Sequence, residues 1–351
     1  MNNIKIQGYK SFRDLELDLR KINILIGSNG SGKSNFLSFF ELINAAYEQR
    51  LEGYVGSGSG VEKYFFNGPK VTSSIGATMS FGNNSYSIEM VESDGQLAFS
   101  HEKLGYFGSS LDIAKYRKEL FIKDYTGMKR GDYIKYYLSG IKKYHFHDTG
   151  RTSPFTHTSN IYNDSNYLYV HGENIAAFLY GIHDNYPKTY RIIRRVIQSV
   201  APYFNDFYFN PNENGDLRLQ WRDKYSDITY GPTDFSDGTI RFVALTTLFL
   251  QPKPPAVIII DEPELGLHPF AIEKLSGLIQ SAAQKGTQII AATQSASLIS
   301  FFKPEDVLTV NQIDGESKIK RLNQEDLNLW LDDYSLGDLW QQNILKGGQP
   351  E

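Results

Sequence analysis

Alternating apolar and polar positions at the start of the chain predict strands. The alternating apolar residues are Ile4, Ile6, Leu15 and Leu17. A continuous apolar run at 22–26 then ends at Gly27, which is typical of a short buried strand. Apolar residues recur at helical spacing after it, so we predict a helix from Ser34. Its apolar face consists of Phe36, Leu37, Phe40 and Ile43.

Three further alternating segments follow, separated by turn residues at 82–84 and 94–95. Their apolar positions are Ala77, Met79 and Phe81, then Tyr86, Ile88 and Met90, then Leu97 and Phe99. This spacing predicts a small antiparallel meander. The stretch 54–60 before it is rich in glycine and serine, which favours a mobile loop.

The middle of the chain, residues 103–200, has mainly helical patterning, interrupted by an irregular polar stretch at 145–166. Pro187 is expected to open its last helix. The apolar face predicted for that helix is Ile192, Ile193, Val196, Ile197 and Val200. A hairpin is expected next, between 207–209 and 217–221, around Asn214-Gly215. We interpret 103–200 as an insertion that acts as a lid or as a surface for a partner.

The last third returns to alternating helices and strands, with helices at 238–250 and around 272–282 and strands at 256–260 and 288–292. Continuous β-branched runs such as 257–260 are typical of parallel strands covered on both faces. We therefore predict an α/β fold in which the first and last portions share one mixed sheet. The predicted division is 1–102, 103–200 and 201–351.

The amino-acid composition excludes some kinds of chemistry but does not identify a binding partner. The chain of 351 residues contains no cysteine, which excludes disulfides, thiolate metal sites and cysteine nucleophiles. The formal net charge of −4 means that any nucleic-acid binding must come from a local basic patch. No apolar run approaches the roughly 20 residues that span a bilayer, and the first residues do not resemble a signal peptide. We expect a soluble, cytoplasmic protein without a membrane partner.

A phosphate-binding loop is the strongest motif. Residues 27–34 fit G-x-x-x-x-G-K-[ST] directly after a predicted strand and before a predicted helix, where the motif has its physical meaning. Glycines let backbone N–H groups point at phosphate oxygens, reinforced by the helix dipole. Lys33 would bridge the β- and γ-phosphates of ATP, and Ser34 would ligate Mg²⁺. The candidate residues are Gly27, Ser28, Asn29, Gly30, Ser31, Gly32, Lys33, Ser34 and Asn35. The alternative is a glycine-rich turn with an adjacent lysine.

Two carboxylates, Asp261 and Glu262, follow the apolar strand at 256–260. Ligands of open α/β sheets bind at the carboxyl ends of strands. Asp261 would hold Mg²⁺ through water, and Glu262 would polarise the attacking water. We find no N-K-x-D motif of a GTPase, and a simple kinase would not need the second carboxylate.

A polar turn, Ser236-Asp237-Gly238, opens the helix about two dozen residues before Asp261. Serine and glycine at a helix N-terminus form an anion site. The alternative is an ordinary N-cap by Ser236 or Asp237, which the turn alone favours.

Together these residues resemble the ABC-type heads of the SMC/RecF/OLD group of ATPases. Residues 6–12 resemble the first strands of that group, 235–238 its signature, and 261–269 its Walker B and D-loop. The closer resemblance is to compact bacterial ATPases without coiled coils, many associated with anti-phage defence and encoded beside a small nuclease-like protein. The segments that carry it are 145–149, 176–180, 293–295 and 330–340.

The resemblance implies Mg-dependent ATP hydrolysis coupled to closure of a head-to-tail homodimer, or of an oligomer of such dimers. Ser236, Asp237 and Gly238 would then act on the partner subunit's γ-phosphate, and a separate effector would carry the output. Gln294 replaces the usual switch histidine; its amide can donate a hydrogen bond but carries no charge. The glutamine of the usual Q-loop is not located, so a scaffold that binds ATP and hardly hydrolyses it is the alternative.

Two further patterns have a functional and a structural interpretation. A cluster of metal-binding residue types, His145, His147, Asp148 and His157, could suggest a metal-dependent nuclease, but its spacing is not diagnostic and a polar loop is favoured. Tyrosines at 133–144 alternate with lysines and could bind nucleic acid, although a solvated amphipathic helix is slightly favoured. The basic residues of the middle segment are Lys115, Arg117, Lys118, Lys129, Arg130, Lys142 and Lys143.

Overall fold

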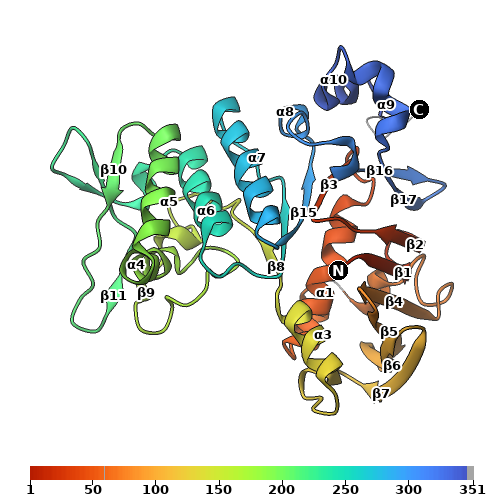
Figure 1. The fold of residues 1–351 in the computed structure, drawn as a ribbon. Coiled ribbons are helices and arrows are strands. Elements are labelled where there is room, and N and C mark those ends of the chain that lie inside the picture. Colours follow the sequence, from red (N-terminus) through yellow and green to blue (C-terminus); the bar gives the residue numbers. More distant parts are fainter. Residues whose placement is uncertain (59, 346–351) are drawn as a thin grey trace.

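A computed structural model describes residues 1–58 and 60–345 (Figure 1). The central feature is a six-stranded sheet in the order β17-β16-β3-β15-β14-β8. Its strands are β3 (Ile22–Ile26), β8 (Ile141–Tyr144), β14 (Val257–Asp261), β15 (Gln288–Thr293), β16 (Val307–Ile313) and β17 (Glu316–Arg321). All neighbours pair in parallel except β16 with β17. The first and last thirds therefore share one sheet, as the sequence predicts.

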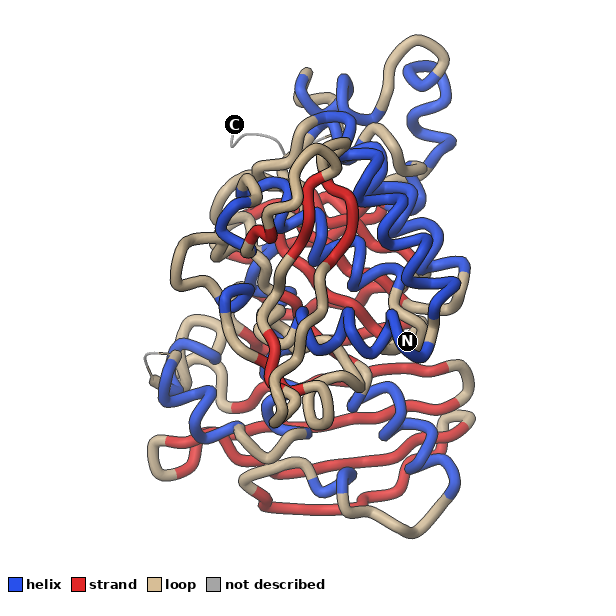
Figure 2. The backbone as a smooth tube through the Cα atoms, turned by 90° about the vertical axis from the view of Figure 1, so that its left-hand side faces the viewer, coloured by secondary structure: helices blue, strands red, loops and turns tan. Residues whose placement is uncertain are grey.

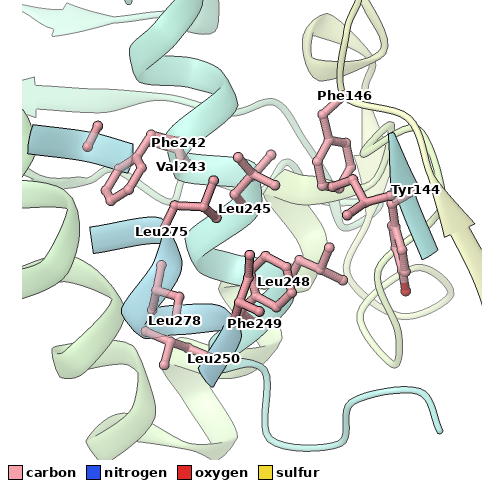
Figure 3. Packing of buried hydrophobic residues seen from close by; sticks show 14 of the residues in the cluster. Tyr144, Phe146, Phe242, Val243, Leu245, Leu248, Phe249, Leu250, Leu275 and Leu278 are labelled. Carbon is pink, nitrogen blue, oxygen red and sulfur yellow. The ribbon is translucent and has the colours of Figure 1, made fainter. Parts of the chain in front are cut away.

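Alternate residues of these strands enter two hydrophobic cores on opposite faces of the sheet. Ile258 and Ile260 pack in one core with α6 (Asp237–Leu250) and α7 (Pro269–Gln284), whereas Val257 and Ile259 pack in the other with α1 (Lys33–Tyr47). Figure 3 shows the first core, where Phe242 and Leu245 of α6 lie near Leu275 of α7. The continuous apolar strands are thus covered on both sides.

A second six-stranded sheet is antiparallel, in the order β2-β1-β4-β5-β6-β7, and Figure 2 shows its long strands at one end of the molecule. Its strands are β1 (Asn3–Tyr9), β2 (Phe12–Asp18), β4 (Ser74–Phe81), β5 (Asn84–Ser93), β6 (Gln96–Tyr106) and β7 (Ser109–Arg117). The predicted meander is present and gains β7, which the sequence does not reveal because this edge strand is largely exposed. Helix α3 (Lys129–Ser139) packs against β5 of this sheet.

Some expectations differ from the structure. The predicted loop at 54–60 overlaps α2 (Leu51–Ser57), whose Leu51 and Val55 are buried, while residue 59 lies outside the described residues. Tertiary packing overrides the poor helix propensity of its glycines. Residues 103–200 are also not a separate helical insertion, because β6 and β7 continue the meander to Arg117 and β8 joins the central sheet. Strand β8 is only four residues long, with two lysines between its buried ends.

The rest of the middle segment contains α4 (Ile175–Asn185) and α5 (Pro187–Val200); α5 packs between α4 and α6. Ile193 and Ile197 of α5 are buried, as predicted. Ile192 is exposed, so the prediction that it belongs to the apolar face of this helix is wrong. Small strands complete this part: β9 (Ser159–Asn160), β10 (Phe204–Phe207), β11 (Asp216–Leu217), β12 (Trp221–Asp223) and β13 (Thr229–Tyr230). The expected hairpin is realised by β10 and β12, which pair Phe207 with Trp221.

The C-terminal part consists of α8 (Ala296–Ile299), α9 (Gln324–Leu331) and α10 (Leu336–Gln341). In the part of the chain that the structure describes, five 3₁₀ turns connect other elements: Val61–Tyr64, Phe121–Lys123, Pro154–Thr156, Pro232–Asp234 and Pro304–Asp306. A Cβ on Gly337 would lie 2.3 Å from the Ala296 carbonyl oxygen, so α10 packs closely against α8. Among the described residues, no helix has the length and apolar character that crossing a membrane requires.

Candidate active site

The loop at 27–34 joins β3 to α1 and depends on its glycines. Gly30 and Gly32 have φ angles of 79° and 113°, which favour glycine. A Cβ on Gly32 would lie 2.1 Å from the Ser317 hydroxyl oxygen, and one on Gly27 would lie 2.4 Å from the Val310 carbonyl oxygen. Strands β16 and β17 therefore support the loop from behind.

The Lys33 ammonium lies under this loop. It donates hydrogen bonds to the carbonyl oxygens of Gly27 and Ser28, at 2.7 and 2.9 Å. Burial lowers the pKa of Lys33, while the nearby charges of Asp261 and Glu262 oppose that shift. Within the described chain, the buried Ser31 hydroxyl has no hydrogen-bond partner. A cation and an unsatisfied hydroxyl fit an anionic ligand such as a polyphosphate.

The strand β14 places Asp261 opposite the start of α1. The Ser34 hydroxyl lies 3.4 Å from Oδ2 of Asp261. A hydroxyl and a carboxylate are hard oxygen donors, which Mg²⁺ prefers and usually supplements with water and phosphate oxygens. Ser34 and Asp261 thus fit a magnesium ion held together with a triphosphate.

Glu262 has a strained backbone at the end of the same strand, with a φ of 40°. Its N–H donates to the carbonyl of Ala292 at 2.8 Å, which fixes it to β15. The Gln294 amide donates to Glu262 Oε1 at 2.8 Å. The structure therefore brings together two residues that lie far apart in the sequence, and Gln294 orients the carboxylate.

Thr293 and Glu264 form a buried hydrogen-bonded pair that the sequence did not predict. The Thr293 hydroxyl donates to the Glu264 carboxylate and accepts from the Ser295 N–H at 2.9 Å. Burial raises the pKa of Glu264, while the hydrogen bond from Thr293 opposes the rise. The sequence signal was a third acidic residue, Glu264, directly after Asp-Glu-Pro, but its partner could not be deduced from spacing.

Ser236 is the N-cap of α6. Its hydroxyl accepts a hydrogen bond from the Thr239 N–H at 3.2 Å, so the alternative prediction that Ser236 caps this helix is correct. Ser236 and Asp237 are exposed. A Cβ on Gly238 would lie 2.4 Å from the Gly266 carbonyl oxygen, so the turn packs directly on the segment after Asp261-Glu262.

Arg241, one turn further into α6, is a connecting residue that the sequence analysis also missed. Its guanidinium donates to the carbonyl oxygens of Phe146 at 2.9 Å and His147 at 3.0 Å, and also to that of Leu265. The side chain is buried. Arg241 therefore ties the signature-like helix to the segment after β8 and to the segment after β14.

The four residues of the possible metal cluster do not converge. His145 contacts Glu41 at 3.0 Å and stacks on His171 with ring centroids 5.5 Å apart. Burial and the Arg241 charge lower the pKa of His147, while the charges of Asp261 and Glu262 oppose that shift. No group of three or more His, Asp or Glu suited to a metal ion occurs among the described residues.

Two cavities flank the phosphate loop. One of about 610 Å³ is lined by Lys10, Ser11, Asn35 and neighbouring residues of α1 and α2. The Asn35 amide donates to the Ser11 hydroxyl at 2.9 Å, which joins this cavity to the start of α1. The other, of about 520 Å³, is lined by Gly27, Ser28, Gln294, Ala296, Trp340, Gln341, Gln342 and Asn343. Its far wall is thus the end of α10.

Two family models match this chain. Residues 83–300 match the family described as "AAA domain, putative AbiEii toxin, Type IV TA system", and residues 1–90 match an AAA ATPase domain. None of the curated proteins has a significantly similar sequence.

Solved structures show the same fold. The head of an Smc protein bound to the C-winged helix domain of ScpA has a TM-score of 0.62 and 16% identity, covering 93% of this chain and 99% of the other. An Smc head with an extended coiled coil, bound to the C-terminal domain of ScpA derived from Pyrococcus furiosus, has a TM-score of 0.56 and 14% identity, covering 95% and 98%. The predicted ABC-type head fold is confirmed, and this chain is a compact version of it.

Proposed function

Because this chain belongs to the AbiEii-type AAA domain family, whose members are ATPases, we propose that it hydrolyses ATP in a magnesium-dependent reaction that closes and reopens a homodimer. The observation that carries the proposal is the gathering of Lys33, Ser34, Asp261 and Glu262 at one edge of the central sheet. These residues come from two loops more than two hundred positions apart.

Each residue has a distinct role in this reaction. Lys33 exchanges its two carbonyl partners for β- and γ-phosphate oxygens, and the loop N–H groups hold the remaining oxygens. Ser34 and Asp261 would hold Mg²⁺, and that ion would supply positive charge to the phosphate groups. Glu262 accepts a hydrogen bond from the attacking water and polarises it, while Gln294 holds the carboxylate in place. Gln294 can also donate its second amide hydrogen to the γ-phosphate.

The nucleoside occupies the cavity of about 610 Å³ beside the loop. Asn35 and Ser11 face it from the start of α1 and from the β1–β2 turn, and Lys10 supplies a cation. His147 offers a further side chain at the same edge of the central sheet. It follows β8, which runs parallel to β14 and ends at the same edge of the sheet.

Closure of a head-to-tail dimer follows from the position of the signature-like turn. Helices α6 and α1 lie on opposite faces of the central sheet, as their separate cores require. Ser236 and Asp237 are exposed at the start of α6 and are free to face a second molecule. In the closed dimer, Ser236 and Gly238 contact the γ-phosphate bound to the partner.

The biological role consistent with this machinery is a regulatory or sensing ATPase in the bacterial cytoplasm, in anti-phage defence or another DNA-related process. A separate nuclease-like effector carries the output, and the middle segment contacts that effector or nucleic acid. Smc heads of the same fold are bound to a domain of ScpA, a second protein, which supports a binding surface of this kind.

A nucleotide-stabilised scaffold is the second candidate, because Gln294 lacks the charge of a switch histidine. The two candidates predict different turnover. A scaffold keeps bound ATP intact, whereas an ATPase releases phosphate continuously and stops when Glu262 is altered.

Steady-state phosphate release tests the proposal. Glu262→Gln keeps shape and hydrogen bonding but removes the base, so we expect release to fall at least about a hundredfold, with normal ATP binding and an accumulating ATP-bound dimer. Glu273→Gln, at an exposed position of α7, is the matched control and should behave as wild type. Added DNA or the neighbouring gene product should change the wild-type rate. Undiminished release by Glu262→Gln would contradict the role of Glu262, and no release by wild type in any mixture would favour the scaffold.

A further inference from the structure

A second groove lies at the opposite edge of the central sheet from the active site. It has a volume of about 530 Å³. Lys21 precedes β3, Ala256 precedes β14 and Gln288 opens β15, so the groove is built on the amino ends of three parallel strands. The candidate catalytic residues follow the carboxyl ends of the same strands. The groove is therefore separate from the nucleotide site.

The lining of this groove combines cations and aromatic rings. Its residues are Met1, Asn2, Leu19, Arg20, Lys21, Phe81, Gly82, Tyr133, Tyr137, Ala256, Gly286 and Gln288. None of these described lining residues is acidic, although acidic residues outnumber basic ones in the whole chain. The local charge thus differs in sign from the net charge of −4, which favours a negatively charged ligand.

The aromatic residues form a stepped row. The rings of Phe81 and Tyr137 have centroids 4.8 Å apart, and those of Tyr137 and Tyr133 have centroids 5.2 Å apart. Phe81 is buried and supports Tyr137, whereas 42% of Tyr133 is exposed. An exposed ring on a rigid support costs little entropy when a flat ligand stacks on it.

The row continues along α3 toward the β6–β7 turn. Tyr136 contacts Tyr137 with centroids 5.3 Å apart and is 63% exposed. The Arg130 guanidinium lies over the ring of Tyr106, 5.5 Å from its centroid, and that ring is 44% exposed. Figure 1 shows α3 beside the strands of the antiparallel sheet. Alternating rings and cations thus extend beyond the groove.

We propose that this groove and the adjoining row on α3 bind single-stranded nucleic acid. Phosphates lie against Arg20, Lys21 and Arg130, and bases stack on Tyr133 and Tyr136. Unpaired bases are required because stacking needs open base faces, which a duplex hides. The resulting recognition tolerates many sequences, since every base has an aromatic face.

The binding is independent of the ATP site. None of the groove residues lies in the phosphate loop or among the candidate catalytic residues. If the protein does not bind nucleic acid, the proposal that it hydrolyses ATP still stands. If it does not bind ATP, the proposal that this groove binds single-stranded nucleic acid still stands.

Fluorescence anisotropy with labelled oligo-dT and oligo-U, using the full-length protein without nucleotide, tests the proposal. We expect saturable binding that weakens with salt, and weaker binding to a duplex of the same length. Tyr133→Ala should reduce affinity about tenfold because a stacking ring is removed. Lys21→Glu should reduce it further and lower the slope of log K against log salt by about 0.7 for each phosphate that the variant no longer neutralises.

Lys224→Glu and Tyr225→Ala are the matched controls, since both lie in the exposed segment between β12 and β13. They should bind as wild type. Thermal unfolding of all four variants verifies folding. The proposal would be overturned if the groove variants and the controls lost binding equally. It would also be overturned if the protein bound duplex more tightly than single strands. Absence of nucleic-acid binding by wild type would also overturn it and would assign the groove to an acidic protein partner.

Discussion

At the scale of single residues, Lys33 shows how the site is prepared for its ligand. In the structure its ammonium donates to two loop carbonyls, at 2.7 and 2.9 Å. Those bonds keep the ammonium ordered beneath the loop, and the charges of Asp261 and Glu262 oppose the lowering of its pKa by burial. A phosphate that arrives meets a positioned cation, so binding requires little reorganisation.

We expect Lys33→Ala to abolish measurable Mg-ATP binding. Hydrogen bonds to charged groups contribute about 1.5–3 kcal/mol each, so removing two of them weakens binding by about a hundredfold or more. Isothermal titration calorimetry measures this decrease, and Lys285→Ala at an exposed position after α7 serves as the control. Tight ATP binding by Lys33→Ala would show that the phosphate site lies elsewhere.

At the scale of elements, α6 is joined to the rest of the active site by one side chain. Arg241 donates to carbonyls in two segments that follow β8 and β14. These contacts make the position of the signature-like turn dependent on both strand ends. A shift in either segment is thus transmitted to the surface that faces the partner.

Arg241→Met keeps most of the apolar stem but leaves three carbonyl oxygens without this donor. We expect the free energy of unfolding to fall by about 2–3 kcal/mol, since buried unsatisfied groups are costly. Urea denaturation measures this change. Arg195→Met on the exposed side of α5 should alter stability by less than about 0.5 kcal/mol. Equal stabilities for the two variants would contradict the connecting role of Arg241.

At the scale of the whole molecule, the two halves of each composite site come from two subunits in the proposed dimer. The phosphate loop and the signature-like turn belong to helices on opposite faces of the sheet, so pairing is head to tail. The end of α10 lines a cavity with Ser28 and Gln294, which places it beside the surface that the partner approaches.

Mixing two inactive variants tests the shared site. Ser236→Arg blocks the signature-like turn, and Lys33→Ala removes the phosphate contact. A mixed dimer carries one site with both defects and one intact site, so partial phosphate release should return, provided one site can act alone. Each variant by itself is the control and should stay inactive. A fully active monomer at concentrations below dimer formation would exclude a site shared between subunits.

Features that depend only on residues close together in the chain could be predicted from the sequence. The phosphate loop needs glycines and a lysine at fixed spacing between a strand and a helix, and Asp261 needs only the end of an apolar strand. Features that depend on contacts between distant segments became visible only in the tertiary structure. Strand β8 is too short for its pattern to be read, and it joins the sheet because its backbone pairs with β14. The contacts of Arg241, Gln294 and Thr293 link segments whose separation in sequence carries no signal, because strand pairing and the packing of the two cores bring them together.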